Sequence, residues 1–162
     1  MDIIDKENNY KFRIADKNDG EEIYDLIKKA FENYCANVDK DAPAMDETPE
    51  DIRNDIEENT VIVVEKEDQI LATLRLERRE KERVFLKRFA VLPDYQDRGL
   101  GTMLFQKAEK LVKEREYGNL IYLLSSLENQ GLVKFYKKLG FKCQATDNER
   151  GYERGHWEKE VD

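Results

Sequence analysis

A strand, a glycine-bearing loop and an amphipathic helix follow one another directly between residues 84 and 112. The strand, residues 84–92, ends in four residues that are apolar on both faces, which favours a position in the middle of a sheet. Pro93 begins a turn, the loop contains Gly99 and Gly101, and the helix carries an apolar stripe. Such a connection directs free backbone N–H groups at an anion, but it also occurs as an ordinary tight turn. The loop alone leaves both interpretations open.

Apolar periodicity along the chain predicts seven strands and four helices. The strands are expected over residues 10–15, 60–65, 70–77, 84–92, 120–124, 141–147 and 155–161, and the helices over 19–34, 48–58, 102–117 and 129–139. Residues 36–47 are expected to form an exposed loop, of the kind that often borders a binding site. The element order lacks strict strand–helix alternation, so it predicts an α+β fold with a mixed sheet. The length predicts a single domain, 1–162.

Charge and composition narrow the classes of partner. Charged residues make up 40% of the chain and the formal net charge is −8, which argues against nucleic-acid binding because such binding needs a concentrated basic face. No apolar run approaches the roughly 18 residues of a membrane span, and the N-terminal residues lack a signal-peptide pattern. We therefore expect a cytoplasmic protein with reduced Cys35 and Cys143, neither of which has an identifiable base partner for nucleophilic catalysis. A single histidine, His156, and the lack of paired cysteine spacings argue against a metal site.

Two motifs at fixed distances decide between the interpretations of the glycine loop. Residues 96–101 read Gln-x-x-Gly-x-Gly at the head of one helix. Residues 129–141 begin with Asn, carry Tyr seven residues later and end in Leu-Gly-Phe. Together these motifs resemble the Gcn5-related N-acetyltransferase (GNAT) family, and residues 88–141 hold the specific part of the resemblance.

The resemblance implies a fold of about seven mostly antiparallel strands flanked by about four helices. It also implies a sheet splayed open between the fourth and fifth strands, that is, between the strand ending at Leu92 and the strand starting at Leu120, with acetyl-CoA in the gap. The implied activity is acetyl transfer from acetyl-CoA to a primary amine of a small molecule or peptide, by direct attack in a ternary complex and without a metal. One alternative is a non-catalytic module of the same fold that binds or senses acyl-CoA. A nucleotide-binding domain is disfavoured because the sequence lacks Gly-Lys-Ser/Thr after the loop and contains no Gly-x-Gly-x-x-Gly.

The same resemblance assigns the cofactor site. The main chain of Phe89, Ala90 and Val91 would pair with the pantetheine arm as an added strand, and one of their N–H groups would polarise the acetyl carbonyl. The backbone of the glycine loop would bind the pyrophosphate, because a helix N-terminus offers free N–H groups and a positive potential. The loop residues are Gln96, Asp97, Arg98, Gly99, Leu100, Gly101 and Thr102. Asn129 would hydrogen-bond the cofactor, cap its own helix, or do both.

The acid and the base have unequal support. Tyr136 matches the tyrosine of the family and would donate a proton to the CoA sulfur, although helical spacing alone suits a core residue. Family members that act on protein N-termini commonly carry Glu five residues before the helix Asn129, but that position is Leu124 here. Glu77, near the end of a strand, and Glu80, in the following turn, are candidate bases that act directly or through water, or else they are solvated surface acids.

The acceptor side has a few candidate residues. Lys87 and Arg88 lie on the strand that usually lines the site, and they would suit an acidic feature of the acceptor or of CoA itself. His156 beside Trp157 either lines the acceptor pocket or belongs to an edge strand with no further role. An edge strand near Trp157 could also pair with a second subunit in a homodimer. Acceptor specificity would be set by residues 20–58 and the C-terminal strands.

Overall fold

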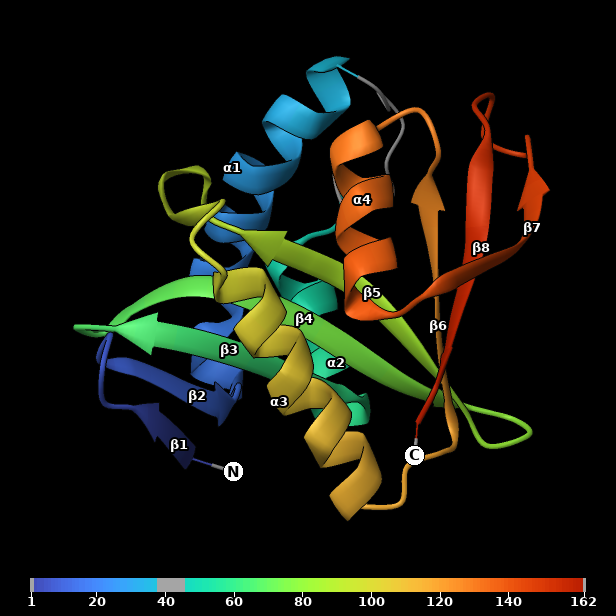
Figure 1. The fold of residues 1–162 in the computed structure, drawn as a ribbon. Helices are drawn as coiled ribbons and strands as arrows, with labels where there is room; N and C mark the ends of the chain where they lie inside the picture. Colours follow the sequence, from blue (N-terminus) through green and yellow to red (C-terminus); the bar gives the residue numbers. More distant parts are fainter. Residues whose placement is uncertain (1, 38–45, 162) are drawn as a thin grey trace.

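The computed structural model describes the backbone of residues 2–37 and 46–161 and the side chains of residues 3–32 and 46–161. It contains an eight-stranded sheet flanked by helices (Figure 1). The strands are β1 (Asp2–Asp5), β2 (Tyr10–Ile14), β3 (Thr60–Lys66), β4 (Gln69–Arg79), β5 (Arg83–Val91), β6 (Leu120–Ser126), β7 (Lys142–Asp147) and β8 (Arg154–Glu160). Their order is β1-β2-β3-β4-β5-β6-β8-β7, and β5 and β6 are parallel whereas the other neighbours are antiparallel. The predicted α+β fold with a mixed sheet is confirmed.

Helices cover both faces of the sheet. They are α1 (Gly20–Asn37), α2 (Pro49–Glu58), α3 (Leu100–Glu114) and α4 (Gln130–Leu139), with short 3-10 turns η1 (Lys17–Asp19) and η3 (Pro93–Tyr95). α1 and α2 lie on one face, and α3 and α4 lie on the other (Figure 1). Thr48 caps α2 in a capping box with Asp51, and Pro49 occupies the first turn of the helix.

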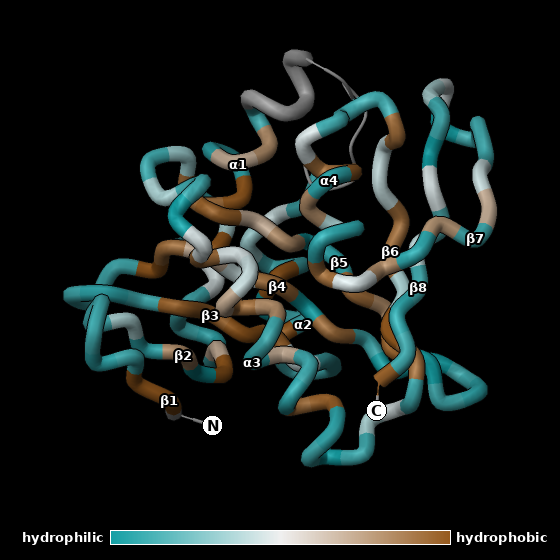
Figure 2. The backbone as a smooth tube through the Cα atoms, viewed as in Figure 1, coloured by the Kyte–Doolittle hydropathy of each residue, from teal (hydrophilic) through white to brown (hydrophobic). Residues whose placement is uncertain are grey.

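The core is centred on β3 and β4. Residues 61–64 and 70–76 are buried without interruption, because helices cover both faces of these strands. Figure 2 shows hydrophobic residues gathered along the central strands and hydrophilic residues at the turns. Arg75 lies within this buried run, and its side chain is 0% exposed. A charge in that position requires partners, which the candidate site supplies.

β5 and β6 are paired at one corner and then separate. Arg83, Val84 and Phe85 pair with Leu120, Ile121 and Tyr122. Gly118 closes the corner, because a Cβ there would lie 2.4 Å from the carbonyl oxygen of Glu82. Asn119 N also donates to this oxygen, at 2.8 Å. The divergence beyond the corner is the splay expected between the predicted fourth and fifth strands.

A bulge at Arg88 marks the part of β5 that has left β6. Arg75 of β4 pairs with Lys87, but Thr73 pairs with Ala90, so β5 contains one extra residue. Arg88 has a φ of +53°, in the left-handed region, which costs an L residue about 1 kcal/mol or more. A bulge bends its strand, and this one re-aims the side chain at position 88.

Three features differ from the sequence-based prediction. β1 adds an eighth strand through a turn in which Asn9 has a φ of 59°, and its short apolar stretch gives too little alternation to signal a strand. The helix expected from residue 19 begins at Gly20, because Asp16 caps the separate η1 turn that leads into it. The expected edge strand near Trp157 is wrong, because β8 lies between β6 and β7 and Trp157 is buried.

Candidate active site

The end of β5, the glycine loop and α4 meet at Phe135 of α4. The Phe135 ring contacts Phe89 of β5 edge to face, with centroids 5.6 Å apart. A Cβ at Gly101 would lie 3.2 Å from Phe135 Cζ and 3.7 Å from Val91 Cγ2. The missing side chain at Gly101 therefore lets α3 approach both β5 and α4. The two sequence motifs are in direct contact.

Gly99 begins α3 in a conformation that presents backbone N–H groups. It is the N-cap, with a φ of 80°, and a Cβ there would meet nothing within 4 Å. The Gly99 carbonyl accepts from Met103 N at 3.0 Å, so the amides of Leu100, Gly101 and Thr102 precede the first intrahelical hydrogen bond. The first turn contains no acidic residue, and a helix N-terminus has a positive potential. This turn suits a phosphate group.

Alanine at the two glycines is expected to have different effects. Gly99→Ala places an L residue in the left-handed region and should cost about 1 to 2 kcal/mol of unfolding free energy without a steric clash. Gly101→Ala should change stability by less than about 1 kcal/mol, because better helix propensity offsets crowding against Phe135. It should nevertheless weaken coenzyme A binding, since Phe135 must shift against Phe89. Thermal unfolding and coenzyme A titration measure the two effects, and identical behaviour of both variants would contradict this division.

β5 has a free backbone edge toward β6 beyond the corner. Leu92 N donates to Leu71 O of β4 at 2.9 Å, and N–H directions alternate along a strand, so the N–H of Val91 points to the opposite side. The Val91 carbonyl accepts from Gln96 Nε2 at 3.0 Å, which ties the glycine loop to the strand.

Tyr136 lies in an aromatic cluster on α4. Its side chain is 8% exposed. The centroid of its ring lies 5.4 Å from that of Phe135, 5.9 Å from Phe141 and 6.3 Å from Trp157. This packing fixes the position of the ring next to the residues that contact β5.

Glu77 lies on β4 opposite Phe85, at the corner where β5 and β6 are still paired. Its carboxylate accepts from Arg79 Nη2 at 3.0 Å and forms an ion pair with Lys87 Nζ at 3.3 Å. The hydrogen bond from Arg79, together with the charge of Lys87, lowers the pKa of Glu77 against the opposing effect of burial. A carboxylate stabilised in this way is a weaker base. Glu80 is exposed in the turn between β4 and β5.

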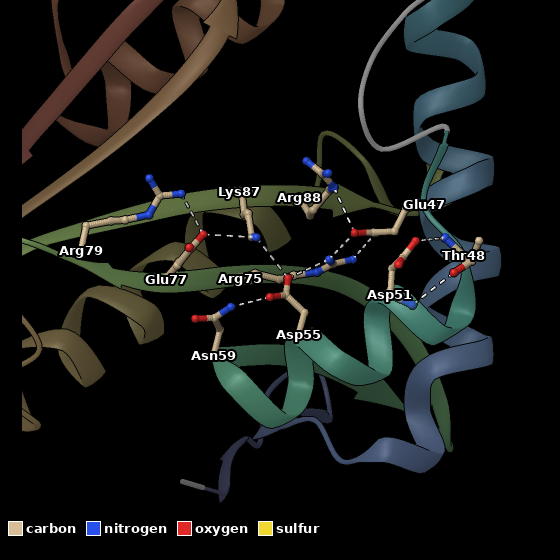
Figure 3. Close-up of polar contacts among 10 residues, drawn as sticks. All are labelled: Glu47, Thr48, Asp51, Asp55, Asn59, Arg75, Glu77, Arg79, Lys87 and Arg88. Carbon is tan, nitrogen blue, oxygen red and sulfur yellow. Dashed lines mark hydrogen bonds and ion pairs between the residues drawn. The ribbon is translucent and has the colours of Figure 1, made fainter.

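A charged network occupies the face of β4 and β5 next to α2 (Figure 3). Arg75 Nη2 donates to Glu47 Oε1 at 2.6 Å, and Arg75 Nη1 donates to Glu47 Oε2 at 2.7 Å and to Asp55 Oδ2 at 3.0 Å. Lys87 Nζ lies 3.3 Å from Asp55 Oδ2, and Arg88 Nε lies 3.5 Å from Glu47 Oε2. The network joins α2 and the residues before it to both strands of the sheet.

Sequence reasoning missed this network. Glu47 falls in the range expected to be an exposed loop, and its carboxylate is largely buried, with a side-chain exposure of 10%. Burial alone would raise the pKa of Asp55, but hydrogen bonds from Asn59 and Arg75 and the nearby positive charges lower it overall. The available signal was Arg75, a charge inside the apolar run of residues 70–76.

Comparison with known proteins identifies the fold and the family. A model of the Acetyltransferase (GNAT) family matches residues 20–141, which is most of the chain. The chain belongs to the GNAT family. PaiA N-acetyltransferase from Thermoplasma acidophilum, solved in complex with coenzyme A, superposes on this GNAT chain with a TM-score of 0.82 and 19% identity, over 93% of this chain and 98% of that one. The resemblance noted in the sequence is confirmed.

Curated relatives of this GNAT chain carry N-acetyltransferase names. The β-lysine N(6)-acetyltransferase of Methanococcus maripaludis is 25% identical over 142 residues, covering 86% of this chain and 48% of that protein. The S-alkylcysteine N-acetyltransferase of Bacillus subtilis is 24% identical over 148 residues, covering 86% of this chain and 83% of that protein. For three of the curated relatives the match spans only 22%, 48% and 32% of their length.

The remaining backbone and cap residues of the expected cofactor site keep the GNAT loop and α4 in place. Ala90 is buried and pairs with Thr73 of β4. Leu100 is 1% exposed, so its side chain packs into the core. Asn129 Oδ1 accepts from Leu132 N at 3.1 Å, which is a helix-capping role.

The charged loop side chains of this GNAT chain lie at the surface. Asp97 has a φ of 62°, and both Asp97 and Arg98 are exposed. The Arg98 guanidinium lies 5.3 Å from the centroid of the Tyr95 ring. These side chains offset one another in charge, so the backbone is the better candidate for phosphate binding.

Two further sequence candidates lie away from the gap of this GNAT chain. His156 of β8 is opposite Leu124, and its Nε2 is paired with the Asp147 carboxylate of β7, on the side away from β5. Cys143 is exposed and its Sγ donates to a backbone carbonyl, whereas the side chain of Cys35 lies outside the described residues.

In the part of the chain that the structure describes, no three His, Cys, Asp or Glu side chains are grouped to hold a metal ion. None of the helices described there combines the length and hydropathy needed to cross a membrane.

Proposed function

We propose that this protein transfers an acetyl group from acetyl-CoA to a primary amine of a small molecule or peptide, by direct attack of the amine in a ternary complex. The observation that carries the proposal is the meeting of the free edge of β5, the glycine-loop helix N-terminus and the Tyr136 helix at Phe135. GNAT membership and the coenzyme A complex of the Thermoplasma neighbour support acetyl-CoA as the donor.

Backbone groups hold the donor in this proposal. The amides of residues 100–102 bind the pyrophosphate at the N-terminus of α3. The N–H groups of Phe89 and Val91 pair with the pantetheine arm in the manner of a neighbouring strand. One of them donates to the acetyl oxygen as negative charge develops there, an effect that is typically worth about 3 kcal/mol in the transition state.

Two side chains, those of Tyr136 and Glu77, assist proton transfer in this proposal. Tyr136 donates a proton to the departing CoA sulfur from its fixed position on α4. Because the pKa of Glu77 is lowered, we propose that water takes the proton from the acceptor amine and that Glu77 orients this water. The names of two relatives, which refer to the amino groups of β-lysine and S-alkylcysteine, support an amine as the acceptor.

Ligand-dependent unfolding and thiol release test the proposal together. Acetyl-CoA at about 100 times its dissociation constant should add about 2.7 kcal/mol to the unfolding free energy, whereas ATP and NAD should add little. Release of the CoA thiol should then depend on the addition of an amine from a screen of amines, amino acids and peptides. Stabilisation by ATP or NAD but not by acetyl-CoA would contradict the proposal. Stabilisation by acetyl-CoA with no thiol release for any amine would indicate a binding module.

A further inference from the structure

Arg88 carries a largely buried charge that is only partly balanced. It lies on the bulge of β5 with a φ of +53°, and its side chain is 22% exposed. Its Nε lies 3.5 Å from Glu47 Oε2, and among the residues that the structure describes this buried nitrogen has no hydrogen-bond partner. Glu47 already accepts from both Nη atoms of Arg75, at 2.6 and 2.7 Å. One carboxylate is therefore shared between two arginines.

The other cations of the network are better paired than Arg88. Arg75 donates to Glu47 and Asp55, and Lys87 forms ion pairs with Asp55 and Glu77. Burial lowers the pKa of Arg88, although the charge of Glu47 opposes this effect. The Arg88 guanidinium is thus desolvated without a full counter-charge.

The terminal nitrogens of Arg88 are available to a ligand. Figure 3 shows them directed away from Glu47 and from the rest of the network. Among the residues that the structure describes, neither nitrogen makes a hydrogen bond. A planar guanidinium with two free donors matches a carboxylate through two parallel hydrogen bonds.

We propose that Arg88 binds a carboxylate of the acceptor, so that the acceptor is an amine that carries a carboxylate, such as a free amino acid. This inference rests on the proposed acetyl transfer and names the acceptor class. Arg88 directly precedes Phe89, on the part of β5 that has separated from β6 and borders the gap. A carboxylate held by Arg88 therefore brings the attached amine close to the acetyl group, where its attack needs little reorientation.

The test compares amino acids with their carboxamides, which keep the amine and lose the negative charge. The probes are methionine with methioninamide and lysine with lysinamide, and thiol release gives kcat/KM for each. We expect the acid to exceed the carboxamide by about 10- to 100-fold, the range of a hydrogen bond to a charged group. The amine of a carboxamide loses its proton more readily, so intrinsic reactivity alone would favour the carboxamide. A preference for the acid therefore reports recognition of the carboxylate.

Three variants attribute this preference to a residue. Arg88→Gln should bring the ratio of acid to carboxamide to about one or below. Arg88→Lys keeps the positive charge but loses the two parallel donors of the guanidinium, so it should retain part of the preference for the acid over the carboxamide. Arg83→Gln is the matched control, because Arg83 lies on the same strand, is 39% exposed and pairs with Glu158. It should keep the wild-type ratio.

Further measurements separate this inference from the proposed function. Calorimetric titration of the four probes into CoA-saturated protein should show the same preference for acids without requiring turnover. Equal binding and equal rates for acid and carboxamide would overturn the role of Arg88 and leave acetyl transfer intact. Absence of thiol release with every amine would overturn the proposed function, while the calorimetric preference and its loss in Arg88→Gln would still support the carboxylate site. A loss of CoA affinity in Arg88→Gln with an unchanged ratio would assign Arg88 to the donor and overturn the inference.

A further set of assays with peptide acceptors tests whether the carboxylate belongs to a free amino acid or to a peptide. Tetrapeptides with Asp or Asn at the second position present or lack a carboxylate near the N-terminal amine. A preference for Asp that exceeds the preference for free amino acids, and that is lost in Arg88→Gln, would support carboxylate recognition on a peptide. A preference for Asp that survives in Arg88→Gln would contradict the role of Arg88.

Discussion

Replacing Tyr136 with phenylalanine is expected to lower kcat by about 100-fold or more, with little change in the affinity for acetyl-CoA. The substitution removes the proposed proton donor for the departing thiolate but keeps the ring and its contacts with Phe135, Phe141 and Trp157. An interaction made only as the carbon–sulfur bond breaks lowers kcat and kcat/KM equally and leaves KM unchanged. Steady-state thiol release with the best acceptor from the amine screen measures both constants.

Tyr117→Phe provides the matched control for this prediction. The Tyr117 hydroxyl accepts from Thr60 Oγ1 at 3.3 Å and from Arg115 Nη1 at 3.2 Å, beyond the C-terminal end of α3. Its removal should cost about 1 kcal/mol of unfolding free energy and leave kcat close to wild type. A wild-type kcat in Tyr136→Phe would show that the thiolate departs without help from this residue.

Arg75→Ala is expected to lower the unfolding free energy by about 3 to 5 kcal/mol, because it breaks a buried ion pair and leaves carboxylates without their main partner. For a chain of this length the thermal midpoint should fall by about 10 °C. The side chain of Arg75 is 0% exposed and its donors hold both Glu47 and Asp55. Denaturant and thermal unfolding of the purified variant measure the loss.

An exposed ion pair serves as a control for the buried network, and the pH dependence of stability provides a second test. Lys110 and Glu114 are 61% and 60% exposed, so Lys110→Ala should change stability by less than about 0.5 kcal/mol. The pKa of Asp55 is lowered in the folded state, so its contribution is present above the ordinary value of about 4 and is lost as the pH falls through the folded value. The wild type should therefore lose stability in acid more steeply than Asp55→Asn. Parallel pH profiles of the two proteins would contradict a stabilising role for the Asp55 carboxylate.

The elements that carry the proposed donor half of the site could be predicted from the sequence, because they lie in local motifs. The strand, loop and helix of residues 84–112 form one continuous unit. Gly99 takes a left-handed conformation, which the local turn before α3 requires. Gly101 was expected as part of the loop that binds the pyrophosphate, and the structure also gives it a packing role against Phe135. Contacts between one helix and the next are invisible in a single motif.

Of the proposed acceptor half, only Lys87 and Arg88 could be suggested from the sequence, because the rest of the network depends on residues that are distant in the sequence. Glu47 and Arg75 are 28 positions apart, and nothing near Glu47 distinguishes it from the other acids of its segment. The free donors of Arg88 depend in turn on what Glu47 is bound to. The strand β1 was missed for a related reason, since its pairing with β2 rather than its own sequence defines it.

The closed corner at Gly118 and Glu82 joins two parts of the sheet. One part consists of β1 to β5 and the other of β6, β8 and β7, and the short parallel pairing between β5 and β6 is the connection between them. A donor that lies along the open edge of β5 would contact both parts of the sheet. The separation of the two parts, and with it the fit of the donor, would then depend on residues at the paired corner, which no ligand atom needs to touch.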